Sequence, residues 1–234
     1  MHIRKIFFTT GRPHFGDIAR MEVASLLDGK QKEMVSALMN YDPETGKTIT
    51  GFPAVHFTGS KVGFGLVGFG ELGRTIVEDA SPIIHRLLSQ KANKPIHIDS
   101  KLITASLDWR PYAINYRVPR MIVQTKRGHT EKLKDPEAGS AHLEQLFLTS
   151  IRRQAEALGI PVPKGAEVKF LGAQRTFTSK IKKHKQAKLG LVNAEFAVNM
   201  NIKGLWSVGY MLSKGFGKFD ATYQLASESS GGMD

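Results

Sequence analysis

The sequence predicts an α+β fold made of two successive halves, each with the element order strand, helix, strand, strand, helix, strand. Two observations support this prediction. Runs rich in β-branched and aromatic residues alternate with segments whose apolar residues recur at helical spacing, and the order occurs twice along the 234 residues. The apolar content of 41% is ordinary for a globular protein with a hydrophobic core.

The first half begins with a β-branched and aromatic run at 3–10, which predicts a strand that ends in the turn at 11–13. Asp17 is a typical helix N-cap, and the apolar spacing after it predicts a helix up to Gly29. The segments that follow predict a short helix, two strands, a helix and a strand at 34–39, 54–58, 63–69, 76–88 and 95–103. This is the order of a ferredoxin-like, or RRM-like, βαββαβ fold.

The second half repeats the order. We expect a strand, a helix, two strands, a short helix and a last strand at 116–125, 140–158, 168–177, 191–202, 204–212 and 219–225. The sequence therefore predicts two tandem ferredoxin-like domains, at 1–108 and 109–226, with a linker near 108–112. The Ser/Gly-rich tail at 227–234 is expected to be flexible.

Charge and composition indicate the class of partner. The formal net charge is +12 and the isoelectric point is about 9.9, which favours binding to a phosphate backbone and predicts a nucleic-acid partner. The absence of cysteine excludes disulfides, thiolate metal sites and thiol catalysis, and suits a reducing cytoplasm. The N-terminal apolar run breaks at Thr9, too early for a signal peptide or a membrane span, so we expect a soluble cytoplasmic protein.

Three patterns that resemble nucleotide or metal sites are rejected on spacing. The segment Gly46-Lys47-Thr48 lacks the glycine that a phosphate-binding loop requires five residues earlier, where Tyr41 stands. The spacing G-x-G-x-x-G occurs at 63–68 and 68–73, but no acidic residue follows at the distance that a dinucleotide site requires. The histidines show none of the paired spacings of metal sites, so neither metal nor cofactor is predicted.

Two segments of the second half suit a polyanion. A basic insertion at 178–190 lies within a stretch, 168–194, that holds seven lysines and arginines and no acidic residue. Such a run often marks only a solvated face, but its place between two predicted strands favours an RNA-binding finger. A Gly-rich loop at 213–218 allows close backbone approach to phosphate. The expected RNA contacts are Arg175, Lys180, Lys182, Lys183, Lys185 and Lys188, and in the loop Lys214, Gly215, Gly217 and Lys218.

Aromatic and basic residues also mix near the predicted linker. Trp109 and Tyr112 precede Arg117 and Arg120, and unpaired RNA bases could stack among them. We therefore include the two arginines among the expected RNA contacts. Trp206, by contrast, is expected in the core.

The segment from 166 to 224 resembles the repeat-processing endoribonucleases of CRISPR systems, which belong to the RAMP superfamily. The resemblance rests on Phe170-Leu-Gly172, on the strand at 194–199, and on Ser213-Lys-Gly-Phe-Gly217 placed directly before the last strand. The basic insertion is similar to that of the variant processing enzymes of type IV systems. In the first half of the chain, only the order of strands and helices is compatible with this family.

This resemblance implies a metal-independent endoribonuclease that cleaves precursor CRISPR RNA within its repeat hairpin. A ribose 2′-OH attacks the neighbouring phosphate and leaves a 2′,3′-cyclic phosphate, and the enzyme often stays bound to its crRNA product. The alternative within the superfamily is a non-catalytic subunit that holds the crRNA handle beside other subunits of a CRISPR ribonucleoprotein. A general RNA-binding protein would explain the charge but not the position of the Gly-rich loop.

The resemblance also places the reactive side chain between the first strand and the first helix. His14 occupies that place and is the candidate base or acid, with Arg12 and Arg20 as candidate phosphate ligands. Two alternatives stay open. His14 could be a loop histidine that only makes a turn hydrogen bond, and the arginines could act by charge and positioning without it.

Overall fold

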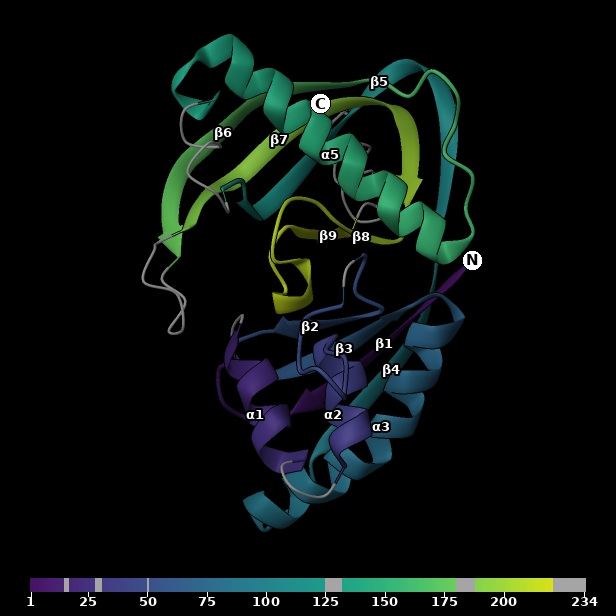
Figure 1. Ribbon diagram of the computed structural model, residues 1–234, viewed down its shortest axis with the longest axis vertical. Helices are drawn as coiled ribbons and strands as arrows, with labels where there is room; N and C mark the ends of the chain where they lie inside the picture. Colours follow the sequence, from purple (N-terminus) through teal and green to yellow (C-terminus); the bar gives the residue numbers. More distant parts are fainter. Residues whose placement is uncertain (15–16, 28–30, 50, 125–131, 180–187, 221–234) are drawn as a thin grey trace, which may run out of the picture. The chain divides into compact units, whose positions relative to one another are not determined.

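The computed structural model describes every residue except 15–16, 28–30, 50, 125–131, 180–187 and 221–234. The described chain forms two compact units (Figure 1). The first comprises Met1–Ile103 with Ser213–Gly215, and the second comprises Thr104–Leu212 with residues 216–220. Both combine helices with antiparallel strands, which confirms the predicted α+β class.

The first unit follows the predicted order of elements. It consists of β1 (His2–Thr9), α1 (Asp17–Leu27), α2 (Lys32–Met39), β2 (Val55–Gly59), β3 (Gly63–Phe69), α3 (Gly70–Ala92) and β4 (His97–Thr104). The strands form one sheet in the order β2-β3-β1-β4, and β3 pairs antiparallel with both β1 and β2. The two ends of the unit's sequence thus supply neighbouring strands, β1 and β4.

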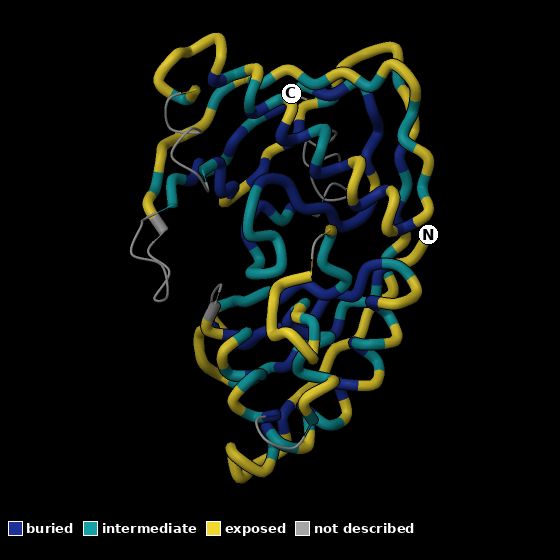
Figure 2. Tube along the Cα trace, in the orientation of Figure 1, coloured by how far each residue is buried: buried dark blue, intermediate teal, exposed yellow. Residues whose placement is uncertain are grey.

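The hydrophobic core of the first unit lies between the sheet and its helices. Ile6 and Phe8 of β1 are buried while their neighbours are partly exposed, the period-two alternation of a strand with one face on a core. Val77 and Ile84 recur at helical spacing on α3 and join the same cluster. Figure 2 shows how burial concentrates on the central strands of this sheet.

The second unit contains β5 (Ser106–Ile122), α5 (Pro136–Leu158), β6 (Val168–Ser179), β7 (Lys188–Lys203), β8 (Leu205–Ser207) and β9 (Lys218–Asp220). A 3-10 helix, η1 (Leu212–Lys214), lies between β8 and β9 in the sequence, and its last two residues belong to the first unit. One antiparallel sheet has the order β5-β7-β6, and β8 pairs with β9 in a separate two-stranded sheet. Helix α5 packs against β6 and β8. It begins at Asp135, whose side chain accepts a hydrogen bond from the Ala138 N–H, and ends at Gly159 with φ +65°.

The segment after β7 is a strand, so the short helix predicted at 204–212 is wrong. Gly204 and Gly209 have φ of +92° and +104°, which end any helix on either side of β8. The buried side chain of Gln154, on α5, completes the strand's hydrogen bonding: it donates to the Ser207 carbonyl and accepts from the Ser207 N–H at 2.8 Å. Trp206 is fully buried, as predicted.

The stretch predicted as a linker, 108–112, lies inside β5. The pairing of β5 with β7 shifts register between Trp109 and Ile114, which lie opposite Met200 and Val198. Residues 110–113 therefore form a bulge opposite a single residue of β7. Trp109 and Tyr112 are exposed at this bulge.

The Gly-rich loop is a tight turn between η1 and β9. Gly215 and Gly217 both have positive φ, +82° and +63°. The Gly217 N–H donates to the Arg120 carbonyl, and its own carbonyl accepts from the Val208 N–H at 2.9 Å. A Cβ on Gly217 would lie only 1.8 Å from the Val208 oxygen. The close backbone approach that this glycine permits is therefore made to the protein's own chain.

We expect Gly217→Ala to destabilise the second unit. The matched control is Gly165→Ala, because Gly165 has a similar φ of +74° but open space around its Cβ position. The control should lose about 1–2 kcal/mol of unfolding free energy from the left-handed backbone, and Gly217→Ala about 1–3 kcal/mol more from the clash. Denaturant unfolding followed by tryptophan fluorescence measures this, since Trp109 and Trp206 both lie in the second unit. Equal losses in the two variants would contradict the prediction.

Candidate functional site

The loop after β1 is fixed by backbone hydrogen bonds to the turn between β2 and β3. The Gly11 N–H donates to the Val62 carbonyl at 3.0 Å, and the His14 N–H donates to the Ser60 carbonyl at 2.9 Å. The His14 ring is buried, with its centroid 5.0 Å from that of Phe64 on β3. The local fold therefore sets both the position and the burial of His14.

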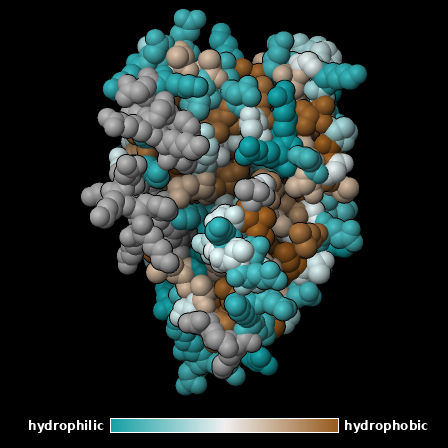
Figure 3. All heavy atoms as spheres, viewed as in Figure 1, coloured by the Kyte–Doolittle hydropathy of each residue, from teal (hydrophilic) through white to brown (hydrophobic). Residues whose placement is uncertain are grey.

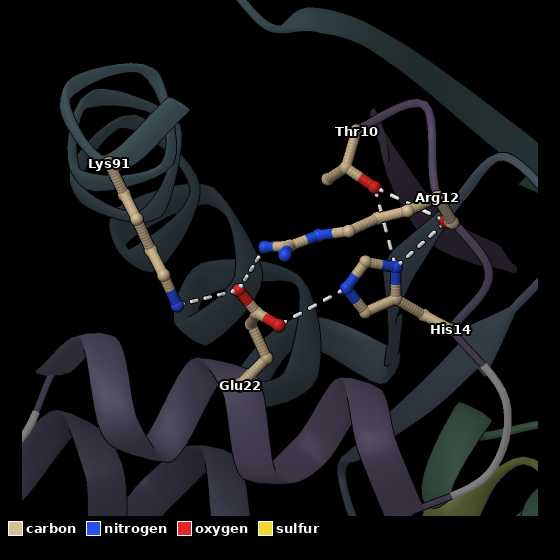
Figure 4. A network of polar contacts seen from close by, with 5 residues as sticks. All are labelled: Thr10, Arg12, His14, Glu22 and Lys91. Carbon is tan, nitrogen blue, oxygen red and sulfur yellow. Dashed lines mark hydrogen bonds and ion pairs between the residues drawn. The ribbon is translucent and has the colours of Figure 1, made fainter. Parts of the chain in front are cut away.

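This histidine belongs to a network of five polar side chains, which we call the Glu22 cluster (Figure 4). Its members are Thr10, Arg12, His14, Glu22 and Lys91. Glu22 Oε2 lies 3.2 Å from His14 Nε2, while Oε1 accepts from Arg12 Nη2 at 2.9 Å and from Lys91 Nζ at 3.1 Å. The other ring nitrogen of His14, Nδ1, lies 3.1 Å from the Arg12 carbonyl and 3.3 Å from Thr10 Oγ1. Both ring nitrogens thus contact protein groups.

Three separate segments of the first unit supply the Glu22 cluster. The loop after β1 carries Arg12 and His14, α1 carries Glu22, and the last turn of α3 carries Lys91, where a cation also complements the helix dipole. The side chains of Arg12 and Lys91 are 55% and 51% exposed, while that of Glu22 is 12% exposed. The two cations are therefore exposed to solvent, while the carboxylate that they contact is mostly buried.

The charge of the Glu22 cluster is unbalanced. Burial tends to raise the pKa of Glu22, but hydrogen bonds to Lys91 and His14 and the charges of Arg12 and Lys91 outweigh it, so the pKa of Glu22 lies below its ordinary value. The carboxylate is ionised at neutral pH. One negative charge then faces two permanent positive charges, even when the imidazole is neutral. The cluster carries a net positive charge and suits an anionic ligand.

Arg20, the third predicted catalytic residue, does not join this cluster. Its guanidinium donates to the Met39 carbonyl at the end of α2 and lies 5.4 Å from the Tyr41 ring centroid. Arg20 and Glu22 are two residues apart on α1, and side chains at that spacing point away from each other on a helix. Arg20 therefore supports the C-terminus of α2.

The expected RNA contacts of the basic insertion are only partly described. Lys180, Lys182, Lys183 and Lys185 lie outside the described residues. Arg175 is exposed on β6, and Lys188 is partly buried at the start of β7. Figure 3 shows that hydrophilic residues are widespread on the viewed surface, with apolar residues between them.

The remaining expected RNA contacts lie on β5 and around the Gly-rich loop, and several make contacts within the protein. The Arg117 guanidinium pairs with Glu195 at 2.9 Å. The Arg120 guanidinium lies 5.2 Å and 5.5 Å from the ring centroids of Phe177 and Phe216, which stack on each other. Lys214 and Lys218, on either side of the loop's glycines, are partly buried.

Sequence reasoning missed Glu22 and Lys91. Glu22 could have been found, since it is an acidic residue five positions past the predicted N-cap, Asp17, and close in sequence to the basic loop. Lys91 gave no signal, because it lies 69 residues further along the chain. Within the described residues, no three histidine or acidic side chains group so as to hold a metal ion. No described helix is long and apolar enough to cross a membrane.

We expect the stabilising effect of Glu22 to depend on pH. Because its pKa is lowered in the folded protein, the carboxylate stabilises the fold above the unfolded pKa of about 4.3, and this contribution is lost as the pH falls through the lower folded pKa. The native protein should melt at a higher temperature than Glu22→Gln near neutral pH, and the difference should shrink below about pH 4.

Calorimetric melting across this pH range measures the difference. Glu44→Gln, which removes an exposed carboxylate of the same unit, is the control and should melt close to the native protein throughout. A Glu22→Gln difference that stays constant from neutral pH to below the folded pKa would show that the charge of Glu22 contributes nothing.

Comparison with known proteins identifies the family. Residues 23–222 match the family model of the type IV CRISPR-associated endonuclease Csf5. The match begins directly after Glu22, so most of the Glu22 cluster lies outside it. A search of curated proteins found no match.

Solved structures with the same fold include RNA-processing enzymes. A structure described as "Csf5, CRISPR-Cas type IV Cas6 crRNA endonuclease" is 17% identical, with a TM-score of 0.70 over 93% of this chain and 98% of the other. A Cas6b structure is 16% identical, with a TM-score of 0.68 over 94% and 100% of the two chains. A second, "CRISPR RNA processing endoribonuclease Cas6b", is 14% identical, with a TM-score of 0.59 over 93% and 97%.

These likenesses show the fold, and the family model covers most of the chain. They confirm the resemblance to the CRISPR repeat-processing endoribonucleases that the Gly-rich loop and the basic insertion indicated. The chain belongs to the type IV CRISPR-associated endonuclease family of Csf5.

Proposed function

We propose that this protein cleaves precursor CRISPR RNA within its repeat hairpin by metal-independent internal transesterification. Membership of an endonuclease family favours this activity over the non-catalytic subunit. In the reaction a ribose 2′-OH loses its proton and its oxygen bonds to the adjacent phosphorus. The bond from phosphorus to the 5′ oxygen breaks, and that oxygen takes up a proton. The products are a 2′,3′-cyclic phosphate and a free 5′-OH.

The observation that carries this proposal is the Glu22 cluster, in which a buried histidine lies beside two exposed cations. The phosphorane formed during the reaction bears extra negative charge, and donors fixed before the reaction stabilise such charge most strongly. Arg12 and Lys91 are held by Glu22 and supply the donors. Glu22 itself is a weak base because its pKa is lowered, so its role is to position the cations and the histidine.

His14 is the proton-transfer group in this proposal. Its Nε2 contacts Glu22 and its Nδ1 contacts the Arg12 carbonyl and Thr10. Proton exchange with the RNA requires that bound RNA replace one of these contacts. Catalytic hydrogen bonds often form fully only in the substrate complex, so this geometry agrees with the role.

The second unit, in this proposal, holds the RNA backbone. Arg175 lies on β6 just before the basic insertion, Lys188 begins β7, and Lys218 follows the glycines of the loop. Lys214, which precedes these glycines, belongs to the first unit. The net charge of +12 supports continued binding of the crRNA product. The absence of cysteine suits a protein of the reducing cytoplasm. The strand order of the first unit supports a ferredoxin-like fold, and we propose that the second unit is a variant of it in which the last strand pairs with β8.

Incubation with a hairpin-containing repeat RNA in EDTA tests the proposed function. We expect cleavage at one site, a 2′,3′-cyclic phosphate on the upstream fragment, and full inhibition by a single 2′-deoxy substitution at the nucleotide that bears the attacking hydroxyl. The same RNA with the 2′-deoxy substitution one nucleotide away is the control and should be cleaved. Tight binding without cleavage would instead favour a non-catalytic subunit.

A further inference from the structure

A small pocket opens beside the Glu22 cluster. It has a volume of about 240 Å³ and is lined by residues from the loop after β1, the last turns of α3 and the position just before β4: Thr10, Arg12, Leu88, Lys91, Ala92 and Ile96. This volume lies below the range of about 300–1,000 Å³ that is usual for drug-sized ligands. The pocket therefore suits one unit of a larger ligand, part of which stays outside it.

The polar side of the pocket is cationic. Arg12 and Lys91 line it, and each gives one contact to Glu22 through a single nitrogen. An arginine has five N–H donors and a lysine three, so donors of both side chains remain for another acceptor. Together with the carboxylate these two side chains have a net charge of +1. A phosphodiester, with one negative charge, neutralises that excess.

The other side of the pocket is apolar. Leu88 and Ile96 belong to the hydrophobic core and are nearly fully buried, so they form a rigid wall that cannot hydrogen bond through its side chains. Thr10 adds a hydroxyl group at the cationic side. A ligand that fits must carry an anionic group next to a less polar body. A nucleotide has this character, with its phosphate beside a sugar and a base.

We propose that this pocket binds one nucleotide of the repeat RNA next to the scissile phosphate. Its phosphodiester contacts Arg12 and Lys91, and its sugar or base lies against Leu88 and Ile96. The proposal rests on the proposed function for the identity of the RNA, and it assigns a binding role to Lys91. The adjacent His14 then lies within one nucleotide of the bound phosphate.

Binding measurements with a non-cleavable repeat RNA, 2′-deoxy at the cleavage site, test this pocket without requiring catalysis. Lys91→Ala should reduce the dependence of log Kd on log salt by about 0.7–0.9, the value of one phosphate contact. Lys91→Arg keeps the positive charge and should show the native salt dependence. Lys94→Ala removes an exposed lysine just outside the pocket and is the matched control. A salt dependence that is equal in Lys91→Ala and Lys94→Ala would overturn the proposal.

A neutral methylphosphonate at each position near the cleavage site then locates the contact. At one position the substitution should abolish the difference between the native protein and Lys91→Ala. A difference that persists at every position would show that Lys91 binds no single phosphate. The native protein could bind the unmodified RNA without cleaving it. In that case a contact located by methylphosphonate substitution would still support the pocket, while the proposed catalysis would be contradicted.

Discussion

The carboxylate of Glu22 is the interaction on which the candidate site depends. It joins the loop after β1 to the last turn of α3 and brings a buried histidine within hydrogen-bonding distance. Burial tends to raise the pKa of this carboxyl, and the surrounding donors outweigh that effect and hold the pKa below its ordinary value. The same carboxylate separates Arg12 from Lys91, two cations that would otherwise repel each other. The site is therefore preorganised for an anion without being neutralised.

The Gly-rich loop has a more structural character than its composition indicates. The space that Gly217 leaves open is taken by the Val208 carbonyl, and Phe216 stacks with Phe177. The guanidinium of Arg120 lies over both rings, so one face of this cation is occupied by contacts within the protein. The loop is thus tied to strands β5 and β6. The backbone of Gly217 is therefore used within the protein.

The sequence predicted the regular elements of the first unit well, because each has one buried face and a clear period. Its prediction failed at 204–212, where the apolar run suits a helix as well as a strand. The strand instead pairs with β9 and is bonded at Ser207 by Gln154, a side chain distant in the sequence. The catalytic roles of His14 and Arg12 stay predictions, made from their place between the first strand and the first helix. Lys91 could not be proposed in this way, because it meets Glu22 only through the fold, 69 residues further along the chain. Arg20 lies outside the Glu22 cluster, because side chains two residues apart on a helix point in different directions.

The central claim is that the histidine held by Glu22 transfers a proton during RNA cleavage. The most direct measurement is the single-turnover cleavage rate of repeat RNA by His14→Ala, with His97→Ala on the exposed strand β4 as the matched control. The claim predicts a rate lower by about 10² to 10⁴ for His14→Ala, an unchanged rate for His97→Ala, and native-like RNA affinity in both. A loss smaller than about threefold would contradict it and assign the chemistry to the cations of the Glu22 cluster.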